Sequence, residues 1–551
     1  MMRSPLKVMM RLIGLVKPLT GYMILAIGMG LAGHLCAAFI TIFGGYALLD
    51  VLGLPTMIGM GAAFVCMIAF SAARAGLRYG EQACNHFIAF KLLALIRDHV
   101  FGALRRLCPA KLEGKDKGNL ISVITSDIEL LEVFYAHTIS PIAIAALFSA
   151  IMVGFIGQIH PALGLLAAIA YIAVGMVIPL IISRLSGEDG ARFRRKSGEL
   201  SSFVLCGLRG LDETIQYGEG QRRLAEMKER TEDLASDEER MKRMTGRNAA
   251  FTNSVILIFD LVMLFAAAML RQAGAIGFEG VLIAVLALMS SFGPVVALAN
   301  LGSTLQNTFA AGNRVMDILD EEPVVEDVTG QMEADFGGAA AEHVSFAYGD
   351  EQILSDVSVE IPKGSVVGIT GRSGSGKSTL LKLMMRFWRV QQGEIQISGR
   401  NVDEINTSDL RRMQSFVTQD THLFHDSIAE NLRIAKPDAT QEEMETACRK
   451  ASVHDLIMRL PKGYETPVAE LGDSLSGGEK QRIGLARAFL HDADMMLLDE
   501  PTSNLDSLNE AVILKSLKEE RAGKTVVLVS HRKSTMGICD RAYSVENGRV
   551  S

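Results

Sequence analysis

The first half of the chain alternates between long apolar runs and hydrophilic stretches. Each run approaches or exceeds the roughly 20 residues that an α-helix needs to cross a bilayer. The runs lie near residues 20–46, 56–78, 134–158, 161–185, 250–271 and 280–302. The alternative, a set of buried core helices in a soluble protein, would have to account for six such runs in a chain that is 49% hydrophobic. The pattern therefore predicts an α-helical membrane domain with six spans.

Two long hydrophilic stretches, roughly 79–133 and 186–249, interrupt the apolar runs. They are helix-rich in composition and too long for simple turns, so we interpret them as helices that extend from the spans into the cytoplasm. Loops rich in Lys and Arg stay on the cytoplasmic side of a membrane. Such residues gather before the first span and after the second: Arg3, Lys7, Arg11, Lys17, Lys91, Arg97, Arg105, Arg106, Lys111, Lys115 and Lys117. Both termini are therefore predicted to be cytoplasmic, and no cleavable signal peptide is needed.

Beyond the last span the apolar runs become short, and one of them leads into a glycine-rich loop. The run Val366–Thr370 precedes this loop, and the helix-like segment Leu380–Phe387 follows it. A phosphate-binding loop requires this context, because its backbone amides close around phosphates and the new helix points its positive end at them. Lys377 would supply a point charge and Ser378 a magnesium ligand. The predicted ATP-binding residues of the loop are Gly371, Arg372, Ser373, Gly374, Ser375, Gly376, Lys377, Ser378 and Thr379.

Polar residues follow three other strand-like runs: Ser415–Thr418, Met495–Leu498 and Thr525–Val529. After the second run, Asp499 is placed to hold magnesium through water, and Glu500 to polarise the attacking water as general base. His531 would contact the γ-phosphate, and Gln419 would sense magnesium as a further ligand. Tyr348, in a Phe-x-Tyr motif, is placed to stack on adenine. A surface-loop role would explain any one of these residues, but all of them in this order predict ATP hydrolysis.

Two further motifs complete the set: LSGGEKQR at 475–482 and MMLLDEPTSNLD at 495–506. Together with the phosphate loop they resemble the ATPases of ABC transporters. The resemblance implies an obligatory dimer, because in this family each ATPase supplies a signature segment to the ATP bound by the other. The start of the signature helix would aim its dipole at that γ-phosphate. The implied signature residues are Leu475, Ser476, Gly477, Gly478 and Glu479, and the implied D-loop residues are Ser503, Asn504, Leu505 and Asp506.

The stretch before the signature resembles that of ABC exporters rather than that of ABC importers. Thr466–Glu479 is similar to the Thr-x-Val-Gly-Glu-x-Gly sequence that precedes the signature in ABC exporters and that importers generally lack. Ala469 departs from the usual glycine, and Glu479 replaces the usual glutamine. Neither change removes a phosphate contact.

With six spans and a fused ATPase, the whole chain resembles one half of a type IV ABC exporter. The implied organisation is a transmembrane domain over 1–312, a linker over 313–336 and an α/β P-loop ATPase domain over 337–551. In such exporters, short coupling helices at the ends of the cytoplasmic extensions rest on the ATPase. Their expected positions here are Gly118–Asp127 and Gly210–Tyr217.

The second span resembles that of CydC, one half of the CydDC thiol exporter. Arg78-Tyr-Gly-Glu81 followed by His86 is similar to the CydC pattern Arg-Tyr-x-Glu-Arg-x-x-x-His, with Gln82 in place of the second arginine. The resemblance implies export of cysteine and glutathione across the bacterial inner membrane, with a CydD-like chain or a second copy of this chain as partner. It also implies a b-type haem, with His86 as axial ligand and Arg78 at a propionate. Further similar stretches are Gly118–Leu120 with Asp127, His137–Pro141 and Phe292-x-Pro294.

Two ionisable residues within spans, His34 and Asp260, are candidates for a translocation path. Such a group costs about 2.5 to 3.5 kcal/mol at the bilayer centre unless it faces water or a partner. The alternatives for each residue are an interhelical hydrogen bond and a position near the membrane surface. The seven cysteines form no Cys-x-x-Cys and no cluster of zinc spacing, which predicts reduced thiols. A net charge of −7 is modest for this length and indicates no nucleic-acid partner.

Several functions remain open on sequence alone. A lipid, peptide or drug exporter would share every ATPase motif and differ in its membrane cavity. A regulatory or sensory membrane ATPase that moves no substrate would share the motifs as well. A soluble ABC ATPase of DNA repair or translation is excluded by the spans. The chain ends at Ser551, where exporters commonly continue through a Gly-Thr-His stretch and another helix, and the sequence leaves open whether it is naturally short or truncated.

Overall fold

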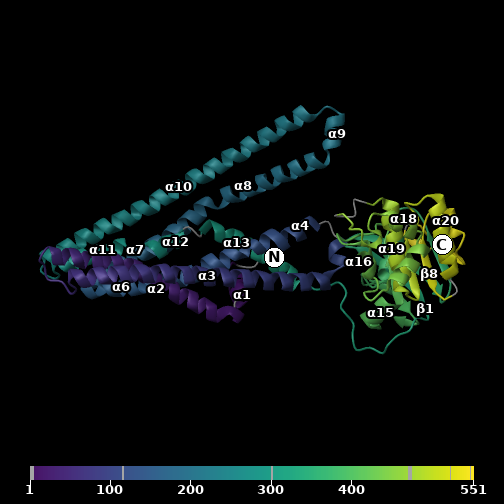
Figure 1. Ribbon diagram of the computed structural model, residues 1–551, viewed down its shortest axis with the longest axis horizontal. Helices are drawn as coiled ribbons and strands as arrows, with labels where there is room; N and C mark the ends of the chain where they lie inside the picture. The colour runs from purple at the N-terminus through teal and green to yellow at the C-terminus, as the bar shows by residue number, and fades with distance from the viewer. Residues whose placement is uncertain are drawn as a thin grey trace. The chain divides into compact units, whose positions relative to one another are not determined.

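The computed structural model describes residues 5–15, 17–113, 117–299, 302–469, 475–520, 523–546 and 548–550 (Figure 1). Arg3, Lys115, Ser551 and the 470–474 part of the stretch before the signature therefore lie outside the described residues. The chain divides into two compact units. The helical unit comprises Met1–Ala103 and Asp116–Asp320, and the α/β unit comprises Leu104–Lys115 and Glu321–Ser551.

The helical unit is built from α-helices, and two of its continuous helical paths contain π-helical turns: 117–159 at Val123–Asp127 and Tyr135–Ile139, and 161–209 at Ala173–Val177. The helix α3 continues past the unit boundary to Leu107. The helices are α1 (Pro5–Leu15), α2 (Thr20–Val51), α3 (Met60–Leu107), α4 (Lys117–Ser122), α5 (Ile128–Phe134), α6 (Ser140–Ile159), α7 (Pro161–Ile172), α8 (Ile178–Arg209), α9 (Leu211–Gln216), α10 (Gly220–Gln272), α11 (Phe278–Met289), α12 (Gly293–Ala299) and α13 (Gly302–Asp320).

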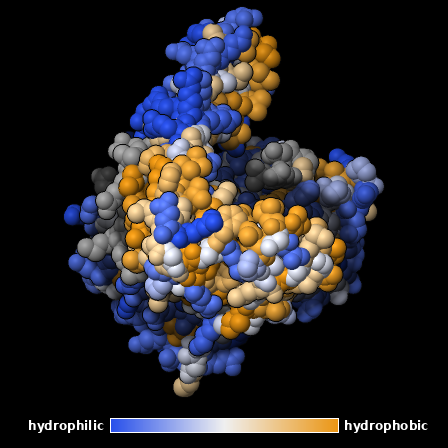
Figure 2. Space-filling model, turned by 90° about the vertical axis from the view of Figure 1, so that its left-hand side faces the viewer, coloured by the Kyte–Doolittle hydropathy of each residue, from blue (hydrophilic) through white to orange (hydrophobic). Residues whose placement is uncertain are grey.

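Six helical segments of the described chain are long and apolar enough to cross a membrane: Lys17–Val51, Met60–Leu107, Ser140–Ile159, Pro161–Ile181, Gly220–Gln272 and Phe278–Leu298. This confirms the six predicted spans, although the third begins at Ser140 rather than 134 because a π-helical turn precedes it. Broad hydrophobic areas cover the end of the helical unit that faces the viewer in Figure 2. Exposed apolar side chains of this kind are expected where lipid is the solvent.

Small residues allow the spans to pack closely. A Cβ added at Gly164 in α7 would lie 2.7 Å from the Cα of Gly157 in α6. Close backbone approach through glycine is a common way for membrane helices to associate, because lipid provides no hydrophobic drive between them. The hairpin of α6 and α7 is therefore fixed by these two glycines.

The second hydrophilic stretch forms a helical hairpin in which α8 and α10 run side by side and α9 joins their ends (Figure 1). Lys196 of α8 bridges Asp233 and Asp237 of α10, at 2.7 Å from each carboxylate. The predicted coupling segment Gly210–Tyr217 coincides with α9, and none of the α9 residues is buried.

The other predicted coupling segment, Gly118–Asp127, lies in the helical unit instead. Asp127 is buried there, and its carboxylate accepts two hydrogen bonds from Arg314 of α13. The segment that belongs to the α/β unit is 104–115, just before it in sequence. Within that unit, Trp388 Nε1 donates to Glu113 at 2.8 Å, and Lys382 Nζ lies 3.0 Å from the same carboxylate. The coupling role of Gly118–Asp127 stays a prediction.

The α/β unit contains two sheets. Its strands are β1 (Gly338–Tyr348), β2 (Glu351–Pro362), β3 (Val366–Thr370), β4 (Gln392–Ile397), β5 (Arg400–Asn401), β6 (Gln414–Val417), β7 (Met495–Asp499), β8 (Thr525–Val529), β9 (Arg541–Glu546) and β10 (Arg549–Val550). Its helices are α14 (Lys377–Met384), α15 (Thr407–Met413), α16 (Ile428–Arg433), α17 (Gln441–Lys450), α18 (His454–Arg459), α19 (Gly477–His491), α20 (Ser507–Glu520) and α21 (Lys533–Met536).

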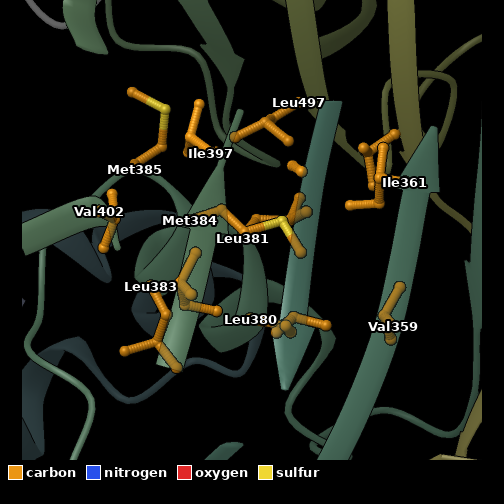
Figure 3. Close-up of a cluster of buried hydrophobic side chains, with 14 of the residues drawn as sticks. Val359, Ile361, Leu380, Leu381, Leu383, Met384, Met385, Ile397, Val402 and Leu497 are labelled. Carbon is orange, nitrogen blue, oxygen red and sulfur yellow. The ribbon is translucent and has the colours of Figure 1, made fainter. Parts of the chain in front are cut away.

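The larger sheet has the strand order β10-β9-β3-β8-β7-β6, and the five strands from β9 to β6 are parallel. The smaller sheet, β2-β1-β4-β5, is antiparallel. The helix α14 contributes Leu380, Leu381, Leu383 and Met384 to a core that also receives residues of both sheets (Figure 3). Every residue of β7 and β8 is buried, as expected for central parallel strands.

The linker predicted over 313–336 forms two different parts in the structure, the end of a helix and a segment without regular structure. Helix α13 continues to Asp320, and the unit boundary follows at Glu321. Residues 321–337 form no helix or strand, and β1 begins at Gly338. The sequence signal at 312 was weak because α13 is amphipathic and remains helical after its apolar content falls.

Candidate nucleotide-hydrolysis site

The predicted site residues follow the carboxyl ends of neighbouring parallel strands. The phosphate loop follows β3, and His531 follows β8. Asp499 is the last residue of β7, Glu500 comes directly after it, and Gln419 follows β6. In the sheet these strands are adjacent in the order β3-β8-β7-β6. The carboxyl ends of parallel strands meet at one edge, which is where open α/β sheets bind ligands. The structure thus brings together residues that are far apart in the sequence.

The phosphate loop depends on glycine at its two ends. At Gly371 the backbone has φ +148°, and a Cβ would lie 2.2 Å from the carbonyl oxygen of Val545. At Gly376, with φ +98°, a Cβ would lie 2.5 Å from a Leu354 methyl group. Neither position accepts a side chain. The loop therefore holds its backbone amides free for phosphate oxygens.

Helix α14 begins directly after this loop, at Lys377 rather than at Leu380 as predicted, and it ends at Met384 rather than Phe387. The left-handed Gly376 caps it, so the first free amides of the helix belong to the loop motif itself. Lys377 is 6% exposed, and its ammonium group donates to the carbonyl oxygens of Gly371 and Arg372 at 3.0 and 2.8 Å. The cation is thereby held at the mouth of the loop, ready for phosphate oxygens.

Asp499 and Ser378 form a pair that fits a magnesium ion. The Asp499 carboxyl group is buried, and its Oδ1 atom has no hydrogen-bond partner among the described residues. Burial raises the pKa of Asp499 above its ordinary value, and a hydrogen bond from Ser378 opposes that rise. A divalent cation would compensate the orphaned oxygen and favour the charged carboxylate. Magnesium supplies charge neutralisation at transferring phosphates, and Ser378 and Asp499 are the residues that would hold it.

Glu500 occupies a strained backbone position with φ +48°. Its amide donates to the carbonyl oxygen of Val529 at 2.9 Å, and its carboxylate lies 3.4 Å from His531 Nδ1. Left-handed conformations of non-glycine residues cluster at functional sites, where surrounding contacts hold them. The arrangement places the predicted general base and the predicted γ-phosphate sensor side by side.

Gln481, to which the sequence analysis gave no role, connects the signature helix to this edge. It is 1% exposed, and its amide nitrogen donates to the carbonyl oxygen of Glu500 at 2.7 Å and to Ser503 Oγ at 3.2 Å. Its amide oxygen accepts from Asn504 N at 3.2 Å. A buried amide with both ends satisfied fixes the Glu500 backbone relative to the D-loop. The sequence feature that could have revealed this role is that Gln481 is a polar residue on the buried face of a predicted helix.

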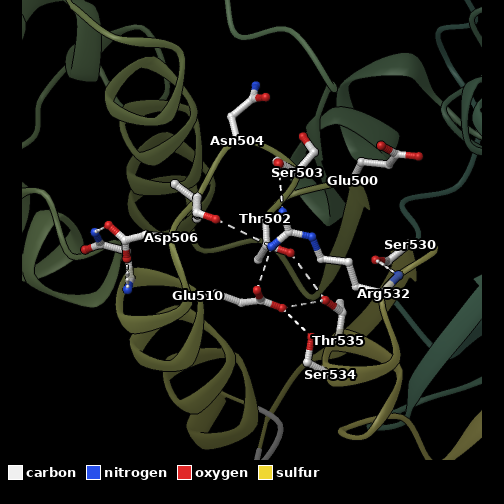
Figure 4. Close-up of polar contacts among 12 residues, drawn as sticks. Glu500, Thr502, Ser503, Asn504, Asp506, Glu510, Ser530, Arg532, Ser534 and Thr535 are labelled. Atoms are coloured by element: carbon white, nitrogen blue, oxygen red, sulfur yellow. Dashed lines mark hydrogen bonds and ion pairs between the residues drawn. The ribbon is translucent and has the colours of Figure 1, made fainter.

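Arg532 is a second residue without a predicted role, and Figure 4 shows its side chain reaching between the D-loop and Glu510. Its guanidinium group donates to the Ser503 carbonyl oxygen at 2.9 Å and to the Glu510 carboxylate at 2.6 Å. Glu510 also accepts from the hydroxyl groups of Ser534 and Thr535. The residue after His531 thus ties the His531 loop to the D-loop.

We expect Arg532→Ala to lower both stability and ATP hydrolysis. The change leaves the Glu510 carboxylate, which is 10% exposed, without its charged partner, and loss of a partner from such a group costs about 1–3 kcal/mol. The thermal midpoint of ATP hydrolysis should fall by roughly 2–10 °C. Arg541→Ala is the matched control, because Arg541 pairs with Glu360 on the exposed surface and such pairs contribute ~0–1 kcal/mol. Equal midpoints for the two variants would contradict the bridging role of Arg532.

The predicted signature residues open α19. Ser476 is the N-cap, its hydroxyl group accepts from the Glu479 amide, and the Glu479 carboxylate accepts from the Ser476 amide at 2.8 Å. This reciprocal capping box explains how Glu479 can replace the glutamine usual in the family, since either side chain can accept the hydrogen bond from the Ser476 amide. Ser476 and Gly477 are exposed, and Leu475 is partly buried. Gly478 packs on the D-loop, where a Cβ would lie 2.7 Å from the Asn504 carbonyl oxygen.

The rest of the D-loop leads into α20. Leu505 is buried, whereas Asp506 is exposed and accepts hydrogen bonds from the amide and the side chain of Asn509, both at 2.8 Å. Tyr348 ends β1, and its ring contacts Trp388 edge-on with centroids 5.0 Å apart. Gln419 is exposed in the bend after β6. Adenine stacking by Tyr348 and magnesium sensing by Gln419 stay predictions.

A cavity of about 380 Å³ lies in the helical unit, and we call it the polar cavity for the cluster of polar residues in its otherwise apolar wall. Arg78 pairs with Glu81 in it at 2.7 Å, and the Glu81 side chain is 4% exposed. Asn85 is buried there, and its Oδ1 atom has no partner among the described residues. The polar residues that line the cavity are His34, Arg78, Glu81, Gln82 and Asn85.

His86 and Asp260 lie elsewhere in the helical unit. His86 is not among the residues that line the polar cavity; its ring stacks on Phe90, and its Nδ1 lies 3.7 Å from Glu132. The haem role predicted for His86 and Arg78 stays a prediction. Asp260 lies in α10, with its Oδ1 atom buried and without a hydrogen-bond partner in the described part of the chain.

Two protein-family models match the chain. The model described as ABC transporter matches residues 354–503, which include the phosphate loop and Glu500. The model described as ABC transporter transmembrane region matches residues 23–295, which include the predicted spans.

Several curated proteins are similar over most of their length. A Haemophilus influenzae protein described as an ABC transporter ATP-binding/permease protein is 48% identical over 100% of both chains. The ATP-dependent lipid A-core flippase of the same species is 31% identical over 85% of this chain and 80% of its own length. A Bacillus subtilis protein described as a multidrug export ATP-binding/permease protein is 29% identical over 87% of this chain and 83% of its own.

One solved structure, that of a bacterial Atm1-family ABC exporter with ATP bound, has a similar fold. Its TM-score is 0.84, and the match covers 97% of this chain and 94% of that one at 23% identity. At this identity the likeness shows the fold alone, a helical transmembrane domain followed by an α/β ATPase domain.

Proposed function

The chain belongs to the ABC transporter family, with transmembrane and ATPase regions in one polypeptide, and on that premise we propose that it is one half of an ATP-driven exporter of small polar solutes. Cysteine and glutathione are the first candidates, on the resemblance of the second span to thiol exporters. The proposed location is the bacterial inner membrane, with both termini in the cytoplasm.

One observation supports ATP hydrolysis most strongly. The phosphate loop, Asp499, Glu500 and His531 all lie at the carboxyl ends of neighbouring parallel strands, on one edge of the sheet. Lys377 would bind the phosphates, and the Glu500 carboxylate would take a proton from the attacking water. His531, beside Glu500, would orient the γ-phosphate. These residues supply every protein group that the hydrolysis step asks of one ATPase domain.

ABC half-transporters work as dimers, and two features of this chain suit a partner. The cap of the signature helix, Ser476 and Gly477, is exposed on the α/β unit. The α9 turn at the end of the α8–α10 hairpin has no buried residue and exposes Leu211 and Ile215. We propose that the cap of the signature helix covers the nucleotide of the partner and that α9 is a coupling helix.

We propose that transport follows alternating access. ATP would close the two ATPases and turn the cavity outward, and hydrolysis would reset it.

The polar cavity supports a polar substrate. Arg78 is about half exposed and uses one of its five N–H donors on Glu81, so it can donate to an anionic group. The unpartnered Asn85 Oδ1 can accept from a donor on the same solute. Ionisable residues at membrane depth mark substrate pathways. His34 and Gln82 also line the cavity, beside six apolar residues. Asp260 is a second candidate on the path.

A lipid or drug exporter is the second candidate function. It is favoured by the descriptions of two relatives, a lipid A-core flippase and a multidrug export protein. The wide exposed apolar surface of the helical unit does not distinguish a lipid or drug exporter from an exporter of polar solutes, because any membrane domain presents such a surface (Figure 2).

Transport into inside-out vesicles tests the proposal. We expect ATP-dependent uptake of labelled glutathione or cysteine by vesicles that hold this chain with its partner chain, and none with Glu500→Gln. Glu519→Gln is the matched control, because Glu519 is an exposed residue of α20 that pairs only with Lys515 in the described structure. ATP hydrolysis with uptake of a lipophilic dye or lipid instead of thiols would favour the second candidate. Hydrolysis without uptake of any of these solutes would contradict export and favour a regulatory ATPase.

A further inference from the structure

A second cavity, of about 650 Å³, lies in the α/β unit away from the nucleotide-hydrolysis site. It is formed by the segment 105–110, the extended segment 323–327 and the ends of α14 and α15, all of which belong to the same compact unit. None of its lining residues belongs to the phosphate loop or to the edge that holds Glu500. The charged residues that line it are Arg105, Arg106, Glu326, Asp327, Arg386 and Arg411.

Arg386 is the deepest of these residues. It is 2% exposed, and its guanidinium group donates to the carbonyl oxygens of Val402 and Ile405, each at 2.7 Å, and to the Thr407 hydroxyl group. Its Nε atom has no hydrogen-bond partner in the described structure. Neutral carbonyl groups satisfy donors but do not balance the charge, and the carboxylates of Asp403 and Asp327 act on the buried cation only from a distance.

The backbone at Arg386 is strained as well. Its φ is +50°, in the left-handed region that glycine normally occupies just after a helix. Here it follows α14, which ends at Met384. Left-handed non-glycine residues persist where the side chain is needed, and they cluster at binding sites. The strain and the unpartnered Nε atom are independent observations on the same residue.

Arg411 places a second cation in the cavity wall. Its guanidinium group donates to the Met385 carbonyl oxygen at 2.7 Å and lies 5.0 Å above the Phe387 ring. Burial, together with the nearby charge of Arg386, lowers the pKa of Arg411 to about 10. Among the described residues neither Arg386 nor Arg411 forms an ion pair with a carboxylate, although Asp327 acts on both from a longer distance. The buried guanidinium group of Arg386 and the partly buried one of Arg411 therefore repel each other.

Four guanidinium groups and two carboxylates line the cavity, which gives it an excess of two positive charges. Arg105 and Arg106 are exposed at its rim. A phosphate monoester carries about −1.5 to −2 charge at neutral pH and three acceptor oxygens, which matches both the excess charge and the forked guanidinium donors. The volume exceeds that of a bare phosphate ion and leaves room for a small organic group beside Phe387.

We propose that this cavity binds a small soluble phosphate monoester, which bridges Arg386 and Arg411 to Arg105 and Arg106. Such a ligand holds the segment 105–110 on the α/β unit and so regulates ATP hydrolysis. The site is separate from the ATP site and does not depend on which solute is exported.

Binding of glucose 6-phosphate tests this site. The full chain with its partner chain, in nanodiscs of phosphatidylcholine alone so that no lipid supplies a phosphate monoester, is titrated with glucose 6-phosphate and, as controls, with glucose and with sulfate. We expect saturable binding of glucose 6-phosphate, none of glucose, and slower amide hydrogen exchange at 105–110 and 323–327. The Arg105→Gln/Arg106→Gln double variant should raise the Kd by about tenfold or more, because two charge-assisted donors are lost.

A control variant and the double variant together show whether binding occurs at this cavity. Arg389→Gln is the matched control, because Arg389 is exposed, pairs with Asp403 and does not line the cavity, so its Kd should stay unchanged. Arg105 and Arg106 are exposed, so their replacement should leave folding intact. Binding that persists in the double variant, protection confined to 371–379, or no binding of glucose 6-phosphate would each overturn the proposal.

Discussion

Replacement of Glu500 by glutamine is expected to lower ATP hydrolysis by about 10²–10⁴-fold, the usual contribution of a general base. The amide keeps the size and the strained φ of +48°, and the contacts of the Glu500 backbone with Val529 and Gln481 do not involve the altered group. The variant should therefore fold and bind ATP. The steady-state rate of phosphate release in nanodiscs, beside ATP binding by filter assay, measures the effect.

The control for this prediction is Glu519→Gln, which removes one carboxylate from the exposed face of α20. Its hydrolysis rate should match that of the unaltered chain within about twofold, since exposed substitutions change little. A Glu500→Gln rate within tenfold of the unaltered chain would mean that another group takes the proton. His531, whose Nδ1 lies 3.4 Å from Glu500, would then be the first to examine.

Much of the hydrolysis site follows from the sequence because local pattern determines it. The runs Val366–Thr370 and Thr525–Val529 form β3 and β8 with the predicted bounds. The residues after these strands meet at one edge because parallel strands align their carboxyl ends. The six spans are equally local, since length and apolar content suffice to predict them.

Features that depend on tertiary contacts were not predictable in this way. Gln481 and Arg532 lie in or beside recognised motifs, but their partners, Ser503 and Glu510, are determined by how α19 and α20 pack. The segment 104–115 joins the α/β unit through the contacts of Glu113 with Trp388 and Lys382, which are about 270 residues away in the sequence. Single-sequence patterns carry no record of such distant pairs.

The surroundings of the second-span motif could not be predicted from its pattern. Arg78 and His86 match a haem-binding pattern in sequence, and they lie eight residues apart on α3, a rise of roughly 12 Å. In the structure Arg78 lines the polar cavity with Glu81 and His34, whereas His86 packs on Phe90. These contacts depend on how the helices pack, and the haem role of the two residues stays a prediction.

The second large effect is expected at the signature helix, and it concerns a nucleotide that this chain does not itself bind. Gly477 is the first residue of α19, where the helix dipole presents about half a positive charge. Gly477→Asp would place a carboxylate where the γ-phosphate bound by the partner chain has to approach. Loss of such anion stabilisation lowers the rate by about 10²–10³-fold, and repulsion should weaken ATP-driven dimer closure as well.

The substitution is a clean test because the site has room for a side chain. A Cβ at Gly477 would meet only Asn504 side-chain atoms, at 3.7 Å or more, whereas a Cβ at Gly478 would lie 2.7 Å from a backbone oxygen. Gly477→Asp should therefore fold and keep its own phosphate loop, and Gly523→Asp, at an exposed glycine with open space around it, serves as control. In mixed dimers, Gly477→Asp in one chain and Lys377→Ala in the other should leave one intact composite site if the two chains are identical. Retained hydrolysis in that mixture would establish that each signature acts on the nucleotide of its partner, and full hydrolysis by Gly477→Asp alone would contradict the role assigned to α19.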